Sequence, residues 1–546
     1  MSSAARGPST ESQGSEPQPA QRESVRDLLR HSWIYSLAPV FQRLLSIVLI
    51  RLYTQRLTLG EFGVLEIIDL LILIVPQLVG INLLNGLTRF YFDHADPRRR
   101  AQVVSSATIA LAVLSFAVAA LTLLAREPLA ALLFSLPSGQ ATPDGLLEAL
   151  GIAILIVPFS ICTASGLRYL QILKLSRAAT SLQLAKTVLE SALKLWMLFG
   201  LDWGVSGFLL SVLIGEVLAA AGLTLWMVLR LRTGFDWSVF KPLLVFSIPL
   251  VPLGLVQLGL HQFGRQVIEH LGPQQLVEGA GAELGVTIAR EWVGVFGLGH
   301  KIAFLIHTAV LTPFMQIWYP HVYELPAEAR RTELVRLGDW AFAALCAFYL
   351  PAAIFGRQAV DILSGSEVFR AAWRVTPIVV AAYLMYGSYA ISQVALLAEK
   401  RNWSLLGVNL FALVVGVGLS CYAVPHSAEH GYAAASWATL AAFAPLALAA
   451  EWLARSRGWG SRSARAGVTL AAISALTIAG VLAIDAWRDP LESTSALASV
   501  LALKLGLAAV TAALLWRAGL DAEGRAGLAR LVRDALAKFG LRTGSR

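Results

Sequence analysis

The amino-acid sequence predicts an all-α polytopic membrane protein with fourteen transmembrane helices, arranged as two pseudo-symmetric six-helix lobes plus two C-terminal helices. Three observations predict this fold class. Hydrophobic residues make up 56% of the 546 residues, charged residues only 14%, and apolar runs recur along the whole chain. Soluble domains carry about 25% charged residues. Apolar runs of about 20 residues at this density leave no room for a soluble core.

Each apolar run is long enough to cross a bilayer as a helix. In chain order the runs cover residues 31–52, 63–86, 102–124, 146–166, 180–200, 205–229, 242–263, 293–317, 339–356, 374–397, 404–424, 432–453, 466–485 and 496–516. Basic residues gather in alternate connections, such as Arg98–Arg100, and in both tails. Because short loops rich in Lys and Arg stay in the cytoplasm, both termini are expected there. This distribution explains the net charge of +9 without a nucleic-acid partner.

Prolines punctuate the spans at matching places, which suggests an internal repeat of six spans. The matched residues are Pro39 with Pro249 and Pro252, Pro76 with Pro313, and Pro158 with Pro377. Each proline removes a backbone hydrogen bond and can kink its helix. The repeat predicts an N-lobe over residues 25–232, a C-lobe over 233–458 and a helix pair within 459–516, with both lobes in the same orientation. The alternative is that prolines are simply frequent in membrane helices.

The two tails differ from the apolar runs between them. Residues 1–24 are rich in Ser, Gln, Pro and Glu, a composition typical of disorder. In residues 517–546, Leu528 and Leu531 share one helical face while Arg530 lies on the other. This pattern predicts a basic amphipathic helix on the anionic cytoplasmic leaflet, with an ordinary solvated tail as the alternative.

One predicted span, residues 180–200, carries its charges along a single side. The polar positions on this stripe are Gln183, Lys186, Glu190 and Lys194. Their spacing places them on one face of an α-helix. A charge near the bilayer centre costs at least about 2.5–3.5 kcal/mol, so the stripe should face protein or a hydrated cavity. Pairing of Glu190 with the lysines would be a purely structural alternative, but it leaves one positive charge over.

Other spans also contain charged residues. The cations within spans or at their edges are Arg43, Arg89, Lys186, Lys194, Lys301 and Lys504, and the acids are Glu66, Asp69, Glu190 and Glu216. The mixture has a cationic excess, which predicts a hydrated cavity that attracts an anion, although structural pairing of all these groups is an alternative. The candidate substrate-binding residues are Arg43, Lys186, Lys194, Lys301 and Arg89, and the candidate ion-coupling residues are Asp69, Glu190 and Glu66.

Motifs for catalysis, nucleotide binding and metal binding are missing from the sequence. It contains no HExxH, Walker A or GxSxG motif, and Cys162, Cys346 and Cys421 form no ligand spacing. We therefore expect no catalytic residue, metal or cofactor. The nearest approach to a phosphate-binding loop is the glycine-rich run 294–301, which lies inside a predicted span and favours close helix packing. The longest outer connection, residues 265–291, is interpreted as a flexible insertion.

Two segments resemble a known family. Residues 50–57, Ile-Arg-Leu-Tyr-Thr-Gln-Arg-Leu, followed by 60–65, Gly-Glu-Phe-Gly-Val-Leu, resemble the first hairpin of bacterial Wzx-type polysaccharide flippases. Residues 293–303 resemble the eighth span of the same family. The resemblance implies membership of the multidrug/oligosaccharidyl-lipid/polysaccharide (MOP) exporter superfamily, with two six-helix lobes around a V-shaped cavity. This chain departs from the family at Gly264-Arg265, where family members often have Asp-Arg. Because glycine replaces the family's aspartate, that aspartate's role in ion coupling does not carry over to this chain.

The resemblance also implies a function and a location. A lipid-diphosphate-linked oligosaccharide would be turned from the cytoplasmic to the periplasmic leaflet of a bacterial inner membrane, driven by H⁺ or Na⁺. Its expected partners are the lipid-linked oligosaccharide, membrane lipids, the coupling ion and polysaccharide polymerase machinery. The alternatives are a lipid II flippase, a cation-coupled multidrug exporter, and an oligosaccharide polymerase or ligase. Cationic drugs prefer acidic, aromatic cavities, and the cationic excess argues against the exporter.

Overall fold

The computed structural model describes most of the chain and leaves out both tails. The described residues are 45, 48–80, 83–94, 96–135, 143–173, 175–248, 250–272, 282–324, 327–364, 366–398, 402–427, 430–456, 460, 463–487 and 493–518. Within these ranges all regular structure is helical. Eleven of the described helices are long and apolar enough to cross a membrane, and a bent pair can supply a twelfth span. The protein is therefore a multi-pass all-α membrane protein. Most of the first predicted span, 31–52, lies outside the described residues.

The first half of the chain supplies seven numbered helices after a helical stretch at residues 48–56. They are α2 (Leu59–Val79), α3 (Leu83–Asp93), α4 (Pro97–Leu124), α5 (Arg126–Leu133), α6 (Asp144–Ile172), α7 (Ser176–Leu195) and α8 (Gly204–Leu231). A capping box begins α2: the Thr58 hydroxyl accepts from the Glu61 N–H, and the Glu61 carboxylate accepts from the Thr58 N–H at 2.9 Å. A π-helical turn, η1 (Trp196–Gly200), continues α7, so the charged span at 180–200 is helical throughout.

The second half supplies the remaining helices. They are α9 (Trp237–Ser247), α10 (Leu250–Leu271), α12 (Ala282–Glu324), α13 (Ala327–Ile354), α14 (Gly356–Leu363), the 3-10 segment η2 (Glu367–Arg374), α15 (Thr376–Ala398), α16 (Asn402–Ala423), α17 (Gly431–Ser456), α18 (Ala464–Trp487) and α19 (Thr494–Ala518). The interpretation of residues 265–291 as a flexible insertion is wrong at both ends. Helix α10 continues to Leu271 and α12 already begins at Ala282, so both helices extend beyond their apolar runs.

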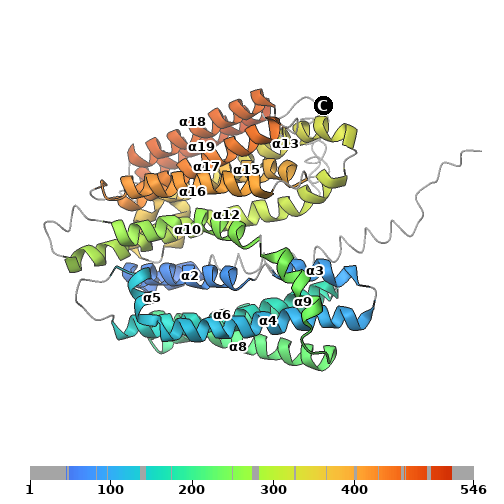
Figure 1. Cartoon of the computed structure of the whole chain (residues 1–546). Helices are drawn as coiled ribbons and strands as arrows, with labels where there is room; N and C mark the ends of the chain where they lie inside the picture. Colours follow the sequence, from blue (N-terminus) through green and yellow to red (C-terminus); the bar gives the residue numbers. More distant parts are fainter. Residues whose placement is uncertain are drawn as a thin grey trace, which may run out of the picture.

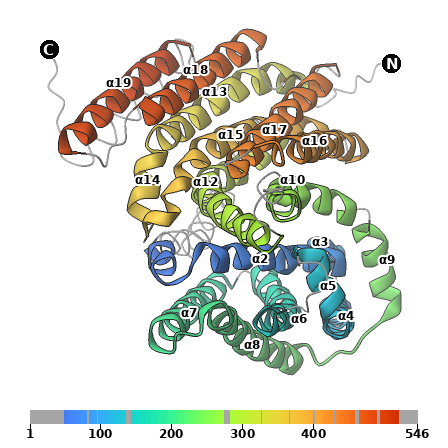
Figure 2. The same ribbon diagram turned by 90° about the vertical axis from the view of Figure 1, so that its left-hand side faces the viewer.

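The helices form two layers, seen one above the other in Figure 1, with α2 to α8 in one and α10 to α19 in the other. The same pairing occurs in each layer: α6 and α7 pack on α8, as α15 and α16 pack on α17. Helices α2, α10 and α12 make most of the contact between the layers. Figure 2 shows α18 and α19 at the outer side of the second layer, where they pack on α13.

The seventh predicted span is broken, as its prolines suggested. Helices α9 and α10 meet at an angle of 45° across residues 248–250. Although α9 follows the predicted lobe boundary at residue 232, it packs on α3 and α4 of the first layer, whereas α10 packs on α12, α16 and α17. Phe90 of α3 and Phe246 of α9 are in edge contact with centroids 6.0 Å apart. The two halves of this span therefore belong to different layers.

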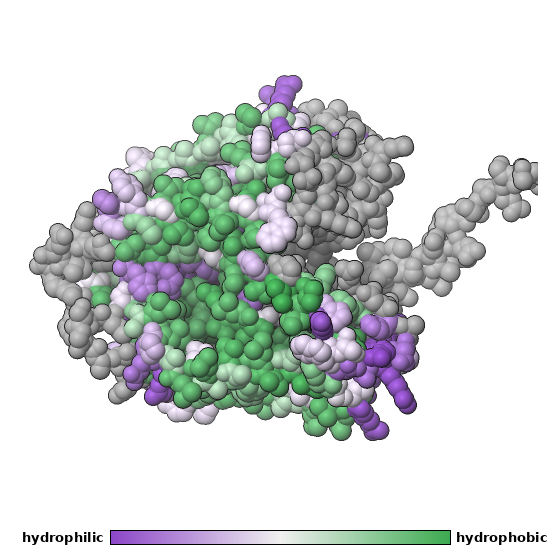
Figure 3. Space-filling view, in the orientation of Figure 1, coloured by the Kyte–Doolittle hydropathy of each residue, from purple (hydrophilic) through white to green (hydrophobic). Residues whose placement is uncertain are grey.

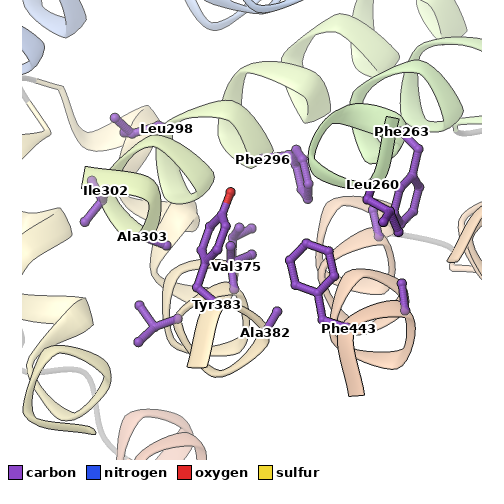
Figure 4. Packing of buried hydrophobic residues seen from close by; sticks show 14 of the residues in the cluster. Leu260, Phe263, Phe296, Leu298, Ile302, Ala303, Val375, Ala382, Tyr383 and Phe443 are labelled. Atoms are coloured by element: carbon purple, nitrogen blue, oxygen red, sulfur yellow. The ribbon is translucent and has the colours of Figure 1, made fainter. Parts of the chain in front are cut away.

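The second layer has an aromatic core that contains hydrogen-bonded polar groups. Figure 4 shows Phe296 of α12, Tyr383 of α15 and Phe443 of α17 packed beside Leu260 and Phe263 of α10. The Tyr383 hydroxyl lies 3.0 Å from His300 Nε2, and the Tyr349 hydroxyl lies 2.9 Å from His307 Nδ1. Such partners remove the desolvation cost of polar groups in a membrane interior.

The surface is divided as a bilayer requires. Figure 3 shows a broad hydrophobic surface across the middle of both layers, with hydrophilic residues gathered toward the two ends of the helices. Many large apolar side chains of the described helices are exposed, among them Leu121, Leu229, Leu448 and Val468. Exposed apolar area of this extent is unfavourable in water and favourable in lipid.

A buried ion pair fastens the C-terminal helix pair. Lys504 of α19 lies 2.7 Å from Asp485 of α18, with both side chains 0% exposed, and its ammonium donates to Gln358 of α14 at 2.9 Å. Arg357 donates to the Asp485 carbonyl at 2.7 Å. Removing one partner of such a pair leaves an uncompensated buried charge, which costs about 3–5 kcal/mol.

We therefore expect Lys504→Met to lower the stability of the protein by about 3–5 kcal/mol, measured by thermal unfolding in detergent. The double variant Lys504→Met/Asp485→Leu should recover most of the loss, because it removes both charges. Equal stability of the single and double variants would mean that the ion pair does not hold the helix pair.

A charged cavity as the candidate functional site

A cavity of about 550 Å³ lies between the two layers. On one side its walls come from α2, α7, α8 and the four residues Leu45, Leu49, Ile50 and Tyr53, and on the other side from α10 and α12. Much of the lining is apolar, and the charged lining residues are Asp69, Glu190, Lys194, Arg265 and Lys301. Buried charges that line a cavity in a membrane protein are candidates for a functional site. The geometry of these groups therefore decides what the cavity can bind.

A four-residue charge network joins the layers at the cavity wall. Glu66 of α2 is 0% exposed and lies 2.6 Å from Arg265 Nη2 of α10. Lys301 of α12 contacts the same carboxylate and lies 3.2 Å from Asp69 of α2. The acids belong to one layer and the cations to the other. The network, defined as Glu66, Asp69, Arg265 and Lys301, is thus an electrostatic tie between the layers.

Glycines bring α2 and α12 close together beside this network. A Cβ atom added to Gly63 would lie 2.1 Å from the Arg290 carbonyl oxygen, and one added to Gly294 would lie 2.4 Å from the Leu59 carbonyl oxygen. One turn farther along, a Cβ on Gly297 would lie 2.4 Å from Glu66 Cγ. The glycine-rich run 294–301 is confirmed as a close-packing segment. We call the contact of Gly63 with Gly294 the glycine crossing.

Further polar contacts join the layers near the glycine crossing. The Ser135 N–H, just after α5, donates to the Glu269 carboxylate at 3.0 Å, and Arg290 donates to the Ser135 carbonyl at 3.3 Å. Phe62 of α2 packs edge-on against Phe369 of η2, with centroids 5.4 Å apart. The two layers are therefore sealed together at the end where α2 and α12 begin.

A second charge network lies within the first layer. Lys186 of α7 lies 2.6 Å from Glu216 of α8 and 3.4 Å from Glu190. Gly215 makes room for Glu190, because a Cβ there would lie 2.4 Å from Glu190 Cγ. Lys186 thus pairs with a carboxylate on the neighbouring helix as well as with Glu190, and the positive charge left over on the 180–200 stripe is that of Lys194. Glu190 lines the cavity, whereas Lys186 is not one of the lining residues.

Lys194 differs from the other cavity cations. Its ammonium lies 4.6 Å from the centroid of the Phe208 ring, a cation–π contact. Among the described residues, no carboxylate lies within 4.0 Å of it. The buried Tyr53 hydroxyl, also in the wall, has no hydrogen-bond partner among the described groups. An anion in the cavity would find both donors available.

The structure brings most of the predicted site residues together. Glu66, Asp69 and Lys301 share one network, Lys186 and Glu190 share the other, and Lys194 lies in the cavity between them. Arg43 lies outside the described residues, and Arg89 lies on α3 with its side chain outside the description.

The expected cationic excess is not found among the described charges of the two networks and the cavity. The cations are Lys186, Lys194, Arg265 and Lys301, and the carboxylates are Glu66, Asp69, Glu190 and Glu216. The formal charges are therefore equal in number. Of the six predicted cations, Arg43 and the Arg89 side chain lie outside the described part of the chain and Lys504 pairs with Asp485 elsewhere, while Arg265 is added. What remains is an uneven pairing, in which Lys194 alone has no close carboxylate among these groups.

Sequence reasoning missed Arg265 as a cavity residue. The apolar run ends at residue 263, and the polar residues after it, such as Gln266 and Glu269, suggested a loop. The helix continues, however, and Arg265 is 4% exposed. The signal available in the sequence was the position of Arg265, two residues after the apolar run. A helix that continues past its apolar run packs its next turn against the neighbouring helices, so a residue there can reach a cavity between them.

Comparisons with known proteins identify the fold. No family model matches the sequence, and no curated protein sequence is similar to it. The lipid II flippase MurJ, in an inward closed conformation, is similar with a TM-score of 0.63 and 12% identity, covering 88% of this chain and 98% of that one. An inward-facing multidrug resistance MATE family transporter of the MOP superfamily is similar with a TM-score of 0.57 and 14% identity, covering 76% of this chain and 94% of that one. A MOP superfamily transporter from Pyrococcus furiosus is similar with a TM-score of 0.51 and 15% identity, covering 78% of this chain and 93% of that one. This chain therefore has the fold of MOP superfamily transporters.

Proposed function

We propose that the protein is a flippase that moves a lipid-diphosphate-linked oligosaccharide from the cytoplasmic to the periplasmic leaflet for surface polysaccharide biosynthesis. The observation that carries this proposal is the Lys194 ammonium, which lies in a cavity between the layers without a close carboxylate among the described residues. Lys301 and Arg265 line the same cavity from the other layer. Cations from both layers can therefore contact one anionic group.

The chemistry of the substrate class fits these cations. A diphosphate cannot cross hydrocarbon without compensating charge, and Lys and Arg supply it through charge-assisted hydrogen bonds. The volume of about 550 Å³ suits a head group rather than a long lipid tail. The apolar part of the lining, with Phe62 and Phe304 among it, can cover sugar faces and the first lipid carbons.

The closed end of the cavity suggests the transport state. By the distribution of Lys and Arg, α2 and α12 begin at the periplasmic side. In this orientation the glycine crossing seals the periplasmic end, and we therefore assign the structure to a state closed to the periplasm. The bend between α9 and α10 connects the two layers and is our proposed hinge.

Ion coupling is assigned to the carboxylates that face the cations. Asp69, with a side chain 35% exposed, and Glu190 line the cavity, and Glu66 lies behind it. Protons or Na⁺ are the proposed driving ions, with Asp69 and Glu190 as their first contacts. Transport by this route involves no covalent chemistry, so the protein is proposed to be a transporter rather than a polymerase or ligase, acting beside polysaccharide polymerase machinery.

A lipid II flippase is the second candidate function. The observation that favours it is the similarity to MurJ, which extends over 88% of this chain against 76% for the MATE family transporter. Both candidate substrates contain a lipid diphosphate, so both would use the same cavity cations. Rescue of a strain depleted of lipid II flipping would favour this second candidate.

A deletion strain tests the proposed function. We expect single, unpolymerised lipid-diphosphate-linked oligosaccharide units to accumulate on the cytoplasmic side while surface polysaccharide disappears. The side is assigned by the access of a membrane-impermeant reagent in intact cells and in inverted vesicles. Accumulation on the periplasmic side would contradict the proposal, because translocation would then be intact and a polymerase or ligase would be missing.

A further inference from the structure

We propose that the substrate's diphosphate competes with the α2 carboxylates for Lys301 and Arg265, so that loading the cavity releases the periplasmic seal. This inference rests on the proposed function and adds a mechanism for its control. The network of Glu66, Asp69, Arg265 and Lys301 would serve two purposes in turn. It ties the layers together when the cavity is empty, and it binds the diphosphate when substrate is present.

The position of the network supports the first purpose. Gly297 packs on Glu66, and the glycine crossing lies one turn farther toward the sealed end. The same stretch of α12 therefore supplies Gly294 to the crossing and Lys301 to the network. Breaking the tie at Lys301 loosens the layer contact directly beside the seal.

The exposure of the four side chains indicates the order of events. Lys301 and Asp69 are 31% and 35% exposed and line the cavity, whereas Glu66 and Arg265 are 0% and 5% exposed. A diphosphate that enters the cavity reaches the Lys301–Asp69 pair first. Its negative charge can replace Asp69 as the partner of Lys301, because phosphate oxygens accept the same kind of charge-assisted hydrogen bond from a lysine as carboxylate oxygens do.

The buried acid supplies the driving force for release. When Lys301 turns to the substrate, Glu66 keeps only Arg265, and a buried carboxylate that loses a partner is strongly destabilised. Separation of α2 from α12 lets water reach Glu66 and removes this penalty. The loaded protein therefore favours the separated arrangement, because the ligand has different affinities for the two states.

Lys194 helps to move the attraction between layers away from the seal. It belongs to α7 in the first layer, and Lys301 belongs to α12 in the second, and both line the cavity. A diphosphate held by both cations joins the layers through the cavity. The electrostatic attraction between the layers then acts through the bound diphosphate and no longer through the contacts beside the seal.

Paired measurements of ligand affinity and layer separation test the proposal. The probe is farnesyl diphosphate added to the purified full-length protein, and farnesol is the uncharged control. Spin labels at Glu127→Cys of α5 and Val368→Cys of η2 report the distance across the sealed end, with the three native cysteines replaced by serine. Both labelled positions are exposed, and their elements lie beside the seal contacts of Ser135 and Phe369.

We expect farnesyl diphosphate, and not farnesol, to shift the label distances of the wild-type protein. Asp69→Asn should bind the probe about tenfold more tightly, a change of roughly 1.4 kcal/mol, because Lys301 loses a competing partner. The same variant should shift the distances at lower probe concentration. Glu451→Gln is the matched control, since it removes a buried carboxylate 2.7 Å from Arg455 within α17, away from the network.

The outcomes separate the inference from the proposed function. If the wild-type protein does not bind farnesyl diphosphate, the proposed function fails and this inference fails with it. If the probe binds but Asp69→Asn binds it no more tightly than Glu451→Gln, competition is disproved while the proposed function remains. Probe binding with unchanged label distances would equally overturn the release of the seal.

Discussion

Gly63→Ala is expected to abolish transport, because the two helices of the glycine crossing have no space for a single methyl group. The added Cβ would lie 2.1 Å from the Arg290 carbonyl oxygen and 3.3 Å from the Gly294 nitrogen. Both are backbone atoms, so no side-chain rotation can relieve the overlap and the helices must move apart. Overpacking of this kind costs about 1–3 kcal/mol.

Gly60→Ala is the matched control for this prediction. Gly60 lies less than one turn earlier on α2, and a Cβ there would meet nothing within 4 Å. Both substitutions add the same methyl group to the same helix, so they differ only in what the methyl group meets. Surface polysaccharide at equal protein level is the first measurement, and cysteine cross-linking between the layers is the second. Equal activity of the two variants would show that the layers do not need the glycine crossing.

The glycine crossing also illustrates what a sequence can and cannot predict. The run with Gly294, Gly297 and Gly299 was recognisable as a close-packing segment, because small residues let membrane helices approach. Its contact with Gly63 was not. Gly63 and Gly294 occupy matching positions in the similar segments 61–65 and 292–296, but similarity between two distant segments does not show that their helices touch. Apolar runs located most of the helices for the same reason: burial in lipid depends on local composition.

The charged groups show the same division. The stripe on residues 180–200 correctly indicated a helix with one polar face, although three charges lower its hydropathy. It could not show that Lys186 pairs with Glu216 of the next helix rather than facing the cavity. Pro249 pointed to the break between α9 and α10, but the change of layer at this break depends on contacts with α3 and α4. Which groups a charged residue or a helix contacts is decided by tertiary packing, and a single sequence does not contain this information directly.

Lys194→Gln should reduce transport strongly while lowering the stability of the protein by no more than about 2 kcal/mol. Lys194 has no carboxylate within 4.0 Å among the described residues, so its removal leaves no buried acid without a partner. The cation–π contact with Phe208 contributes about 0.5–2 kcal/mol, and glutamine keeps much of the packing. Loss of one charge-assisted contact to a diphosphate costs roughly 1.5–3 kcal/mol, which is at least about tenfold in affinity.

Lys186→Gln on the same helix gives the contrasting result, and the pair of variants separates a binding role from a structural one. Its removal leaves Glu216 and Glu190 without their shared cation, so stability should fall by about 3–5 kcal/mol. Probe affinity per folded molecule should change little, because Lys186 is not one of the residues that line the cavity. Thermal unfolding and farnesyl diphosphate binding on both variants distinguish these effects. If Lys194→Gln lost stability but bound the probe normally, Lys194 would be a structural residue and the cavity would need another cation to hold a diphosphate.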